Sequence, residues 1–384
     1  MIAVSLSALA LAIWIYLVFA RGGFWLGRER DDTTPSRLAV PPKVAIIVPA
    51  RNEAENIAQS VTSLLAQNYP AFTLVLVDDD STDGTADIAR RTAAALGKQD
   101  RLIVVSGSPL PPRWTGKLWA VKQGIADAEE KFAPKYLMLT DADIVHAPDT
   151  LGWLVAHAEE GQRVLTSLTA RWRCENLPER VHIPAFIYYF AMLYPFAWVN
   201  RADHPMAGAA GGCMLVRADA LRAAGGIEVI RDALIDDCAL AGAMKQQGPI
   251  WLGLTDRVVS IRPYTTWGDI RRMVARSAYA QLRYSPVLLL GTVAGMVLTY
   301  LVPPFVAVFG SGTARGIGIG TWALMAVVFQ PTLRLYRLSP LWGFALPAIA
   351  FEYLLFALDS AYQYVRGRGG AWKGRVQANV SDPR

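Results

Sequence analysis

Two aspartates, Asp141 and Asp143, stand one residue apart at the end of the apolar run YLMLTD, residues 136–141. Such a run is typical of a buried strand. Two carboxylates at a strand tip, where water and ligand can reach them, suit a hard cation such as Mg²⁺ or Mn²⁺, which binds one or two carboxylates together with substrate phosphates. Taken alone, the pair is more commonly a solvated turn in which Asp149 caps the following helix.

The elements around these acids predict an α/β fold. Runs of β-branched residues and leucine with little polar alternation are typical of strands covered on both faces, and they recur at residues 44–50, 74–79, 102–107 and 136–141. Residues 55–67 place apolar side chains on one helical stripe. We therefore predict a mostly parallel, Rossmann-like sheet, whose ligands gather beyond the carboxyl ends of its strands. Asp79 and Asp141 lie at such ends.

Both ends of the chain are apolar enough for membrane helices. Residues 1–20 carry no charge and are followed by basic residues, which favours a transmembrane anchor over a cleaved signal peptide and predicts a cytoplasmic position for the residues after the anchor. Residues 286–309 and 316–333 are also long enough to span. Residues 340–365 contain two acids and are either a third span, which would put the basic tail outside, or a helix lying in the interface.

Residues 181–200 are apolar as well, but they contain two prolines and interrupt the α/β pattern. Because acids on both sides of this segment must face one compartment, we interpret it as an interfacial or acceptor-facing segment. The chain is then predicted to be a multi-pass protein of the cytoplasmic membrane. Its parts are an anchor (1–20), a cytoplasmic catalytic domain (21–285), membrane or interfacial helices (286–365) and a basic tail (366–384).

Composition excludes several other classes of protein. The formal net charge of +6 is modest and is not gathered in a basic run, which favours contact with anionic lipid over nucleic acid. The three cysteines have no paired spacing, so neither a disulfide framework nor a zinc site is indicated. The first strand is followed by PARNEAEN rather than Gly-x-Gly-x-x-Gly, which argues against a Rossmann dehydrogenase.

Four further motifs occur in a fixed order along the predicted domain. They are PARNEAENI (49–57), VDDDSTDGTADIA (77–89), TGKLWAVKQGI (115–125) and LIDDCALAGAMKQQG (234–248). With the Asp141 and Asp143 pair, this ordered set resembles the family-2 glycosyltransferases, which have the nucleotide-sugar-binding GT-A fold. The resemblance covers residues 43 to about 285. It implies transfer of a sugar from a nucleotide-diphosphate donor, most simply a UDP-sugar.

The resemblance also implies roles for individual residues. For the nucleotide, it implies that Pro49 and Glu53 line the pocket and that Asp79 accepts from the uracil imide. For the diphosphate, it implies that Lys117 lies nearby and that Asp141 and Asp143 hold Mg²⁺ or Mn²⁺. It also implies that Gly211 and Gly212 border the donor sugar. On the acceptor side it matches Asp236 and Asp237 to an acid pair whose second member is the general base, which an attacking alcohol requires. Asp236 is also a candidate helix N-cap.

Two positions depart from the family's pattern. Asp80 stands where glycine is common, which a turn tolerates because aspartate enters left-handed conformations more readily than most residues. The membrane members' Gln-x-x-Arg-Trp element is reduced to Arg283 and Tyr284, with Ala280 in place of glutamine, which argues against a long processive polymer channel. Arg283 and Tyr284 remain candidates for the acceptor side.

Segments along nearly the whole chain are similar to the bacterial hopene-associated glycosyltransferases. They include FIYYFAMLYPFAWVN (186–200), IWLGLTDRVVSIRPY (250–264) and MVARSAYAQLRYS (273–285). This resemblance implies an inverting enzyme that moves a single sugar to the hydroxyl of a hopanoid-related lipid. Two alternatives stay open: a transferase whose acceptor is a polyprenyl phosphate, and a catalytically silent scaffold of the hopanoid pathway.

Overall fold

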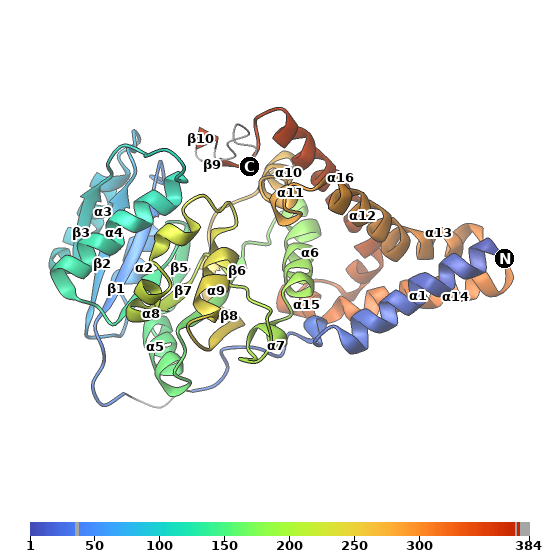
Figure 1. The fold of residues 1–384 in the computed structure, drawn as a ribbon, viewed down its shortest axis with the longest axis horizontal. Coiled ribbons are helices and arrows are strands. Elements are labelled where there is room, and N and C mark those ends of the chain that lie inside the picture. The colour runs from blue at the N-terminus through green and yellow to red at the C-terminus, as the bar shows by residue number, and fades with distance from the viewer. Residues whose placement is uncertain (35–37, 373–374, 377–384) are drawn as a thin grey trace.

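The computed structural model describes residues 1–34, 38–372 and 375–376. A mixed sheet with helices on both faces forms one end of the molecule, and a group of long helices extends from it to the N-terminus at the opposite tip (Figure 1). Parts of the predicted basic tail, residues 373–374 and 377–384, lie outside the described residues.

The sheet has eight strands in the order β3-β2-β1-β4-β7-β6-β8-β5. The strands are β1 (Val44–Ala50), β2 (Phe72–Asp78), β3 (Leu102–Ser106), β4 (Tyr136–Leu139), β5 (Ile144–His146), β6 (Leu165–Trp172), β7 (Met214–Arg217) and β8 (Ile250–Ser260). The first four strands in this order are parallel, and β6 is parallel to β8. The strands β7 and β5 run antiparallel to their neighbours. The predicted α/β fold is confirmed, as a mixed sheet.

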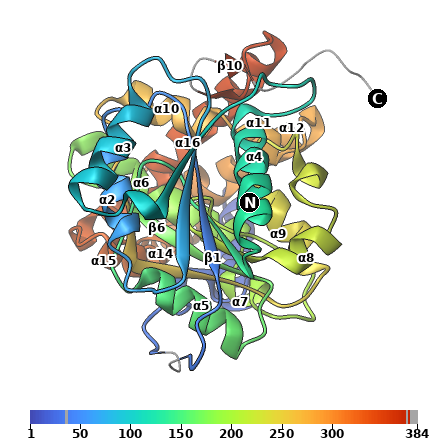
Figure 2. The same ribbon diagram turned by 90° about the vertical axis from the view of Figure 1, so that its left-hand side faces the viewer.

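Successive side chains of a strand point to opposite faces of the sheet, so the apolar core is divided into two parts, one on each face. In β1, Ile46 and Val48 pack under α2 (Ile57–Leu65), α3 (Thr85–Ala95) and α5 (Thr150–Glu160). Ala45 and Ile47 pack under α4 (Gly116–Phe132), and α8 (Ala218–Ala223) and α9 (Asp236–Lys245) cover the same face. Figure 2 shows these two groups of helices on either side of β1. A strand covered on both faces needs apolar residues at every position, as its sequence has.

Residues 181–200 form α6 (Leu177–Leu193) and α7 (Phe196–Val199). A capping box starts α6: Asn176 accepts from the amide of Glu179, and the Glu179 carboxylate accepts from the amide of Asn176. The helix lies between the sheet and the long helices, and contacts α10 (Trp267–Ala275), α15 (Gln330–Leu335) and α16 (Leu346–Val365). It is shorter than the helices that could cross a membrane.

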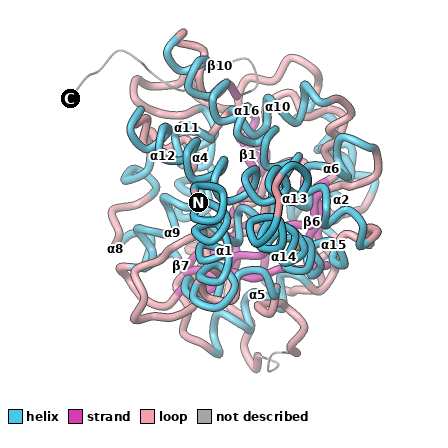
Figure 3. The backbone as a smooth tube through the Cα atoms, turned by 90° about the vertical axis from the view of Figure 1, so that its right-hand side faces the viewer, coloured by secondary structure: helices cyan, strands magenta, loops and turns pink. Residues whose placement is uncertain are grey.

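Four helical segments are long and apolar enough to cross a membrane: residues 2–20, 286–309, 312–335 and 340–365. The first is α1 (Ile2–Ala20), and the second joins α12 (Pro286–Met296) to α13 (Val302–Phe309) through a π-helical turn, η4 (Val297–Leu301). The third joins α14 (Gly312–Val328) to α15. The indole of Trp14 in α1 donates to the carbonyl of Thr299 at 2.9 Å. Helices α1, α13 and α14 pack together, and they lie nearest the viewer in Figure 3.

The fourth segment, η5 (Pro340–Ala345) followed by α16, packs differently. The α16 helix contacts α10, the short helix α11 (Ala278–Gln281) and α6, and also η4 and α12 of the second segment, while η5 packs against α14 and α15. The Tyr353 hydroxyl donates to the carbonyl of His182 at 2.9 Å, the Ser360 hydroxyl donates to the carbonyl of Ala275, and Tyr364 stacks on Tyr284. The C-terminal part of α16 therefore lies beside α10 and α11, whereas η5 packs against the long helices.

The remaining short elements connect these parts. They are η1 (Phe24–Leu26), η2 (Gln99–Arg101), η3 (Ile227–Ile230), β9 (Ala371–Trp372) and β10 (Arg375–Val376).

Candidate active site

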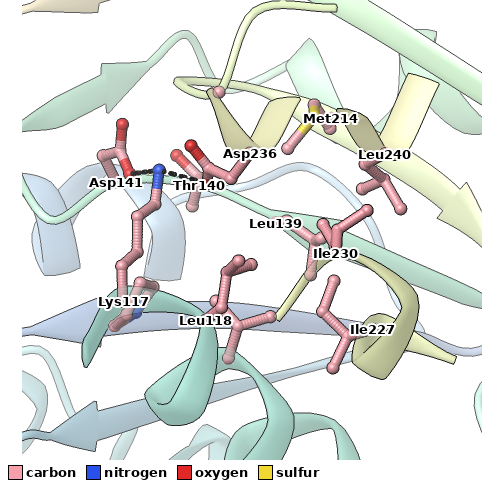
Figure 4. A pocket seen from close by; sticks show the side chains of 13 residues that line it. Lys117, Leu118, Leu139, Thr140, Asp141, Met214, Ile227, Ile230, Asp236 and Leu240 are labelled. Atoms are coloured by element: carbon pink, nitrogen blue, oxygen red, sulfur yellow. Dashed lines mark ion pairs between the residues drawn. The ribbon is translucent and has the colours of Figure 1, made fainter. Parts of the chain in front are cut away.

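A lysine joins two of the predicted acids at the carboxyl edge of the sheet. Lys117 lies in the first turn of α4, whose N-cap Thr115 accepts from the amide of Leu118. Its ammonium lies 2.8 Å from Oδ1 of Asp141, just beyond β4, and 3.0 Å from Oδ2 of Asp236, at the start of α9 (Figure 4). Burial disfavours the charge of Lys117, but the two carboxylates outweigh this and raise its pKa. A fixed cation therefore stands at this edge.

The lysine and the acids form the polar side of a small pocket with an apolar side opposite. Leu118, Leu139, Ile227 and Leu240 line the pocket to the right of the lysine in Figure 4. Pro49, at the end of β1, lines the same pocket. Burial raises the pKa of Asp141, against the lowering effect of Lys117. With Gly211, the pocket brings together predicted residues from five separate parts of the chain.

Asp237 is held next to this pair by backbone amides. Its Oδ2 accepts from the amide of Gly211 at 2.9 Å, and its Oδ1 accepts from the amide of Cys238 at 2.7 Å. Burial and the nearby charge of Asp236 raise the pKa of Asp237 to about 6. The N-cap of α9 is Ile235, so the predicted capping role of Asp236 is wrong, and its carboxylate pairs with Lys117 instead.

The two predicted glycines have different surroundings. A Cβ at Gly211 would lie 3.4 Å from both Oδ2 of Asp237 and Nζ of Lys117, so this glycine borders the polar group. A Cβ at Gly212 would lie 3.2 Å from Ile144, within the sheet core, and the Gly212 carbonyl accepts from Thr140. Gly211 faces the pocket, whereas Gly212 faces the interior.

Arg262, which the sequence analysis did not identify, bridges two predicted site residues. It follows β8, and its guanidinium donates to Oδ2 of Asp143 at 2.5 Å and to Oε1 of Glu53 at 2.7 Å. The side chains of Glu53 and Asp143 are only 8% and 13% exposed, so both charges need a partner. The two carboxylates raise the pKa of Arg262 despite its burial. In the sequence, Arg262 stands in the motif IRPY, which contributed only to the overall resemblance and did not suggest a role for this arginine.

The nucleotide side of the site is built from the ends of β1 and β2. Asp79 is 2% exposed, and its carbonyl accepts from Arg51. Asp80 has φ +58°, as predicted for the position where the family commonly has glycine. These residues lie at the predicted edge of the sheet.

The two acceptor-side candidates lie farther along the chain, at the junction with the long helices. Arg283 and Tyr284 both have positive φ and connect α11 to α12. Gln281, one residue after the alanine that replaces the family's glutamine, accepts from the hydroxyl of Tyr194 at 3.0 Å. Burial is the main cause that raises the pKa of Tyr194, and Cys238 and Asp237 add to the shift. Gln281 was not identified when this segment was compared with the family's Gln-x-x-Arg-Trp element position by position.

The donor set for a cation consists of Asp141 and Asp143. Within the described residues no group of three or more acids, histidines or cysteines is arranged to hold a metal ion. Each of the two carboxylates uses one oxygen for a basic side chain, Lys117 or Arg262. Two carboxylates fit Mg²⁺ or Mn²⁺ when phosphate oxygens and water complete the coordination, as these ions commonly bind.

One alternative from the sequence, a capping role for Asp149, is corrected by the structure. Asp149 stands at the N-cap of α5 but makes no side-chain cap bond, because its carboxylate accepts from Arg257 at 3.0 Å. His146, the histidine nearest to the acid pair in sequence, is 3% exposed and hydrogen-bonds Thr140 through Nε2. It belongs to the core rather than to a cation site.

Comparison with known proteins agrees with this geometry. Residues 45–225 match the model of the family described as Glycosyl transferase family 2, so this stretch carries a domain of that family. The undecaprenyl-phosphate 4-deoxy-4-formamido-L-arabinose transferase of Yersinia enterocolitica is 31% identical over 134 residues, covering 33% of this chain and 37% of that protein. The 4,4'-diaponeurosporenoate glycosyltransferase of Staphylococcus aureus is 32% identical over 134 residues, covering 35% of this chain and 32% of that protein.

One solved structure is similar over almost the full length. The mannosyltransferase PcManGT from Pyrobaculum calidifontis, in complex with GDP-Man and Mn²⁺, has a TM-score of 0.60 and 19% sequence identity, covering 94% of this chain and 99% of that chain. This likeness establishes the GT-A-like fold. The matches with the two curated relatives above span only about a third of the length of each.

Proposed function

We propose that this chain is an inverting, metal-dependent glycosyltransferase that moves one sugar from a nucleotide-diphosphate sugar to the hydroxyl of a hopanoid-related lipid. The observation that carries the proposal is the group formed by Lys117, Asp141, Asp236 and Asp237 at the carboxyl edge of the sheet. It combines a fixed cation, a candidate metal ligand and an acid whose pKa lies near neutrality. Glycosyl transfer to an alcohol can use each of these, the cations at the leaving diphosphate and the acid as the base.

Asp237 is the proposed general base. An alcohol must lose its proton as it attacks the anomeric carbon, and a carboxylate with a pKa of about 6 is ionised at neutral pH while accepting a proton more readily than an ordinary aspartate. The amides of Gly211 and Cys238 fix the orientation of Asp237. The proton would pass from the acceptor hydroxyl to a carboxylate oxygen of Asp237.

Lys117 is proposed to stabilise the leaving diphosphate. Its charge is already held in place by two carboxylates, so little reorganisation is required as negative charge grows on the leaving group. Asp141 and Asp143 would hold a divalent cation, which supplies further charge neutralisation at the diphosphate. Pro49, Glu53 and Asp79 are proposed to bind the nucleotide, and Gly211 leaves room for the donor sugar next to Asp237.

The lipid acceptor is proposed from the position of the site beside the long helices. The acceptor-side candidates Arg283 and Tyr284 stand directly before the candidate span 286–309. Two relatives support a lipid acceptor, since their names describe transfer involving undecaprenyl phosphate and 4,4'-diaponeurosporenoate. We propose that the catalytic part faces the cytoplasm and that the chain is held in the cytoplasmic membrane.

A polyprenyl phosphate is the second candidate acceptor, favoured by the Yersinia enterocolitica relative. A phosphate acceptor is already an anion and needs no strong base. Asp237→Asn separates the two candidates: loss of turnover supports the hydroxyl acceptor, and retained turnover supports the phosphate.

The experiment uses the full-length protein in detergent with a panel of UDP- and GDP-sugars, Mg²⁺ or Mn²⁺, and either hopanoid alcohols or polyprenyl phosphate. We expect a glycosylated lipid from one donor and its loss in Asp237→Asn. Lipid profiling of cells that lack the gene should show the same glycolipid missing and its aglycone accumulated. Absence of both transfer and donor hydrolysis with every donor would support the silent scaffold instead.

A further inference from the structure

A second cavity, of about 600 Å³, lies where the N-terminal segment, α6, α7, α15 and β8 meet. It shares no lining residue with the acid–lysine pocket. Its charged lining consists of Arg30, Arg171, Arg334, Arg337, Glu29 and Asp256. Four arginines face two acids, so the cavity carries excess positive charge.

The positive charge is concentrated on the side formed by α15 and the turn after it. Arg30 and Arg171 both pair with Asp256, at 2.9 and 3.2 Å. Within the described residues Arg334 and Arg337 take part in no ion pair, and their guanidinium groups donate no hydrogen bond. Both side chains are exposed, so they remain available to an anion that enters the cavity.

The backbone at Arg337 supports a role for its side chain. The α15 helix ends in a Schellman motif, in which the amide of Leu338 bonds the carbonyl of Leu333 at 2.9 Å and the amide of Arg337 bonds that of Arg334 at 3.0 Å. This motif places Arg337 at φ +54°, a position that glycine normally takes. The turn fixes the backbone of Arg337 three residues after Arg334, and both side chains line the cavity.

The rest of the cavity wall is apolar and lies at the end of two candidate membrane spans. Phe24 and Trp25 lie in η1, which is separated from the end of α1 by three residues, and Leu335 ends the segment 312–335. Ile187 and Phe196 complete this wall from α6 and α7. If the long helices cross a bilayer, these residues lie at the headgroup boundary, where basic pockets between helices bind lipid headgroups.

We propose that this cavity binds an anionic phospholipid, with the lipid phosphate between Arg334 and Arg337 and an acyl chain along the wall formed by Phe24, Trp25 and Leu335. A soluble anion would use the arginines but would leave the apolar wall exposed to water. A zwitterionic lipid such as phosphatidylcholine would use the wall, but the choline cation beside its phosphate would offset the attraction to the two guanidinium groups. An anionic lipid satisfies both.

The test titrates the full-length protein in neutral detergent with phosphatidylglycerol and, separately, with phosphatidylcholine, and counts retained lipid by native mass spectrometry. We expect the wild type to prefer phosphatidylglycerol. Arg334→Gln and Arg337→Gln should each weaken that binding roughly five- to tenfold, because one arginine near an anionic headgroup contributes on the order of 1 kcal/mol. Arg334→Lys, which keeps the charge, should bind nearly as well as the wild type.

Arg28→Gln is the matched control. Arg28 is exposed and belongs to the N-terminal segment beside the cavity, but its side chain does not line the cavity. An equal loss of lipid in this variant would show a general surface-charge effect and overturn the proposal. Equal binding of the two lipids by the wild type would also overturn it. Displacement of phosphatidylglycerol by millimolar inorganic phosphate would assign the cavity to a free anion instead. Because lipid retention is the readout, the result is independent of glycosyl transfer.

Discussion

Asp237 is the residue on which the proposed chemistry depends most directly. Asp237→Asn keeps the shape of the side chain but cannot accept a proton, so turnover with a hydroxyl acceptor should fall by about 10² to 10⁴. Donor binding, measured by calorimetry, should stay near the wild-type value. Asp236→Asn is the comparison: it removes one of the two partners of Lys117 and should weaken donor binding instead. Reversal of these two results would assign the base to Asp236.

The raised pKa of Asp237 predicts a pH dependence. Because burial raises this pKa to about 6, the base is protonated and inactive below that pH and ionised above it. The value of kcat/KM for the acceptor should therefore fall tenfold for each pH unit below about 6 and reach a plateau above pH 7. The measurement is a pH profile of kcat/KM, with donor binding followed in parallel. An acidic limb near pH 4 would indicate a base with an unshifted carboxylate.

Arg262 allows a sharper test of the cation site than the acids alone. Asp143→Asn should abolish most metal-dependent donor binding, since it removes a charged candidate ligand. Arg262→Gln removes a positive charge 2.5 Å from the same carboxylate, so Mn²⁺ should bind at least as tightly as in the wild type. Calorimetry with Mn²⁺ and nucleotide distinguishes these outcomes. Unchanged metal-dependent affinity in Asp143→Asn would end the assignment of Asp143.

Some site residues could be predicted from the sequence and others could not, for physical reasons. Asp141 could be proposed from the sequence because it ends a recognisable strand, and Asp236 and Asp237 because they match an acid pair of the family that the sequence resembles. Arg262 could not, because a guanidinium reaches its partners through a long side chain from a segment 119 residues away from Asp143. Gln281 was missed for a related reason, since its contact with Tyr194 depends on how α11 packs against α6 rather than on sequence register.

At the scale of elements, the loop before β7 separates a functional glycine from a structural one. Gly211→Ala would place a methyl group beside Lys117 and Asp237 without a backbone clash, so the protein should fold normally while kcat/KM for the donor falls roughly 10- to 100-fold. Gly212→Ala would press on Ile144 and should cost about 1 kcal/mol of stability with activity largely retained. Thermal unfolding and donor kinetics of both variants test this. Equal loss of activity would remove the distinction.

The strands and helices of the sheet domain were predictable, but their arrangement was only partly so. Apolar runs identified β1 to β4 because strands covered on both faces have no polar alternation. The pairing of β5 with β8 was not predictable. The strand β5 is only three residues long, and nothing in so short a stretch indicates that it pairs with a strand more than 100 residues later. The same limit applies to residues 340–365, whose composition fits a span although α16 packs along α6, α10 and α11.

At the scale of the whole molecule, the arrangement of the long helices argues for a specific topology. Met1 and the turn between α13 and α14 lie at the tip farthest from the sheet, and the C-terminal end of α16 lies near the sheet-bearing domain (Figure 1). The segment 340–365 begins beside Gln330, whose amide donates to the carbonyl of Pro340 at 3.1 Å. If α1, 286–309 and 312–335 each cross the membrane, the tip faces away from the catalytic side. Residues 340–365 would then begin and end on the catalytic side, as the interfacial interpretation requires.

Single cysteines test this topology in intact cells, in a background in which Cys174, Cys213 and Cys238 are replaced. Cysteine at the exposed Ser311, in the turn between α13 and α14, should react with an impermeant thiol reagent. Cysteines at Glu175 and Asp203, on either side of α6 and α7, should both be protected, because the acids before and after this segment serve one site. Cysteines at Ser339 and Arg366, which flank η5 and α16, should be protected as well.

All four protected sites should react after the cells are opened, which shows that they are reachable. Labelling of only one site of the 175 and 203 pair would place the two halves of the proposed site on opposite sides of the membrane. Labelling of 366 but not 339 would instead show that residues 340–365 cross the bilayer.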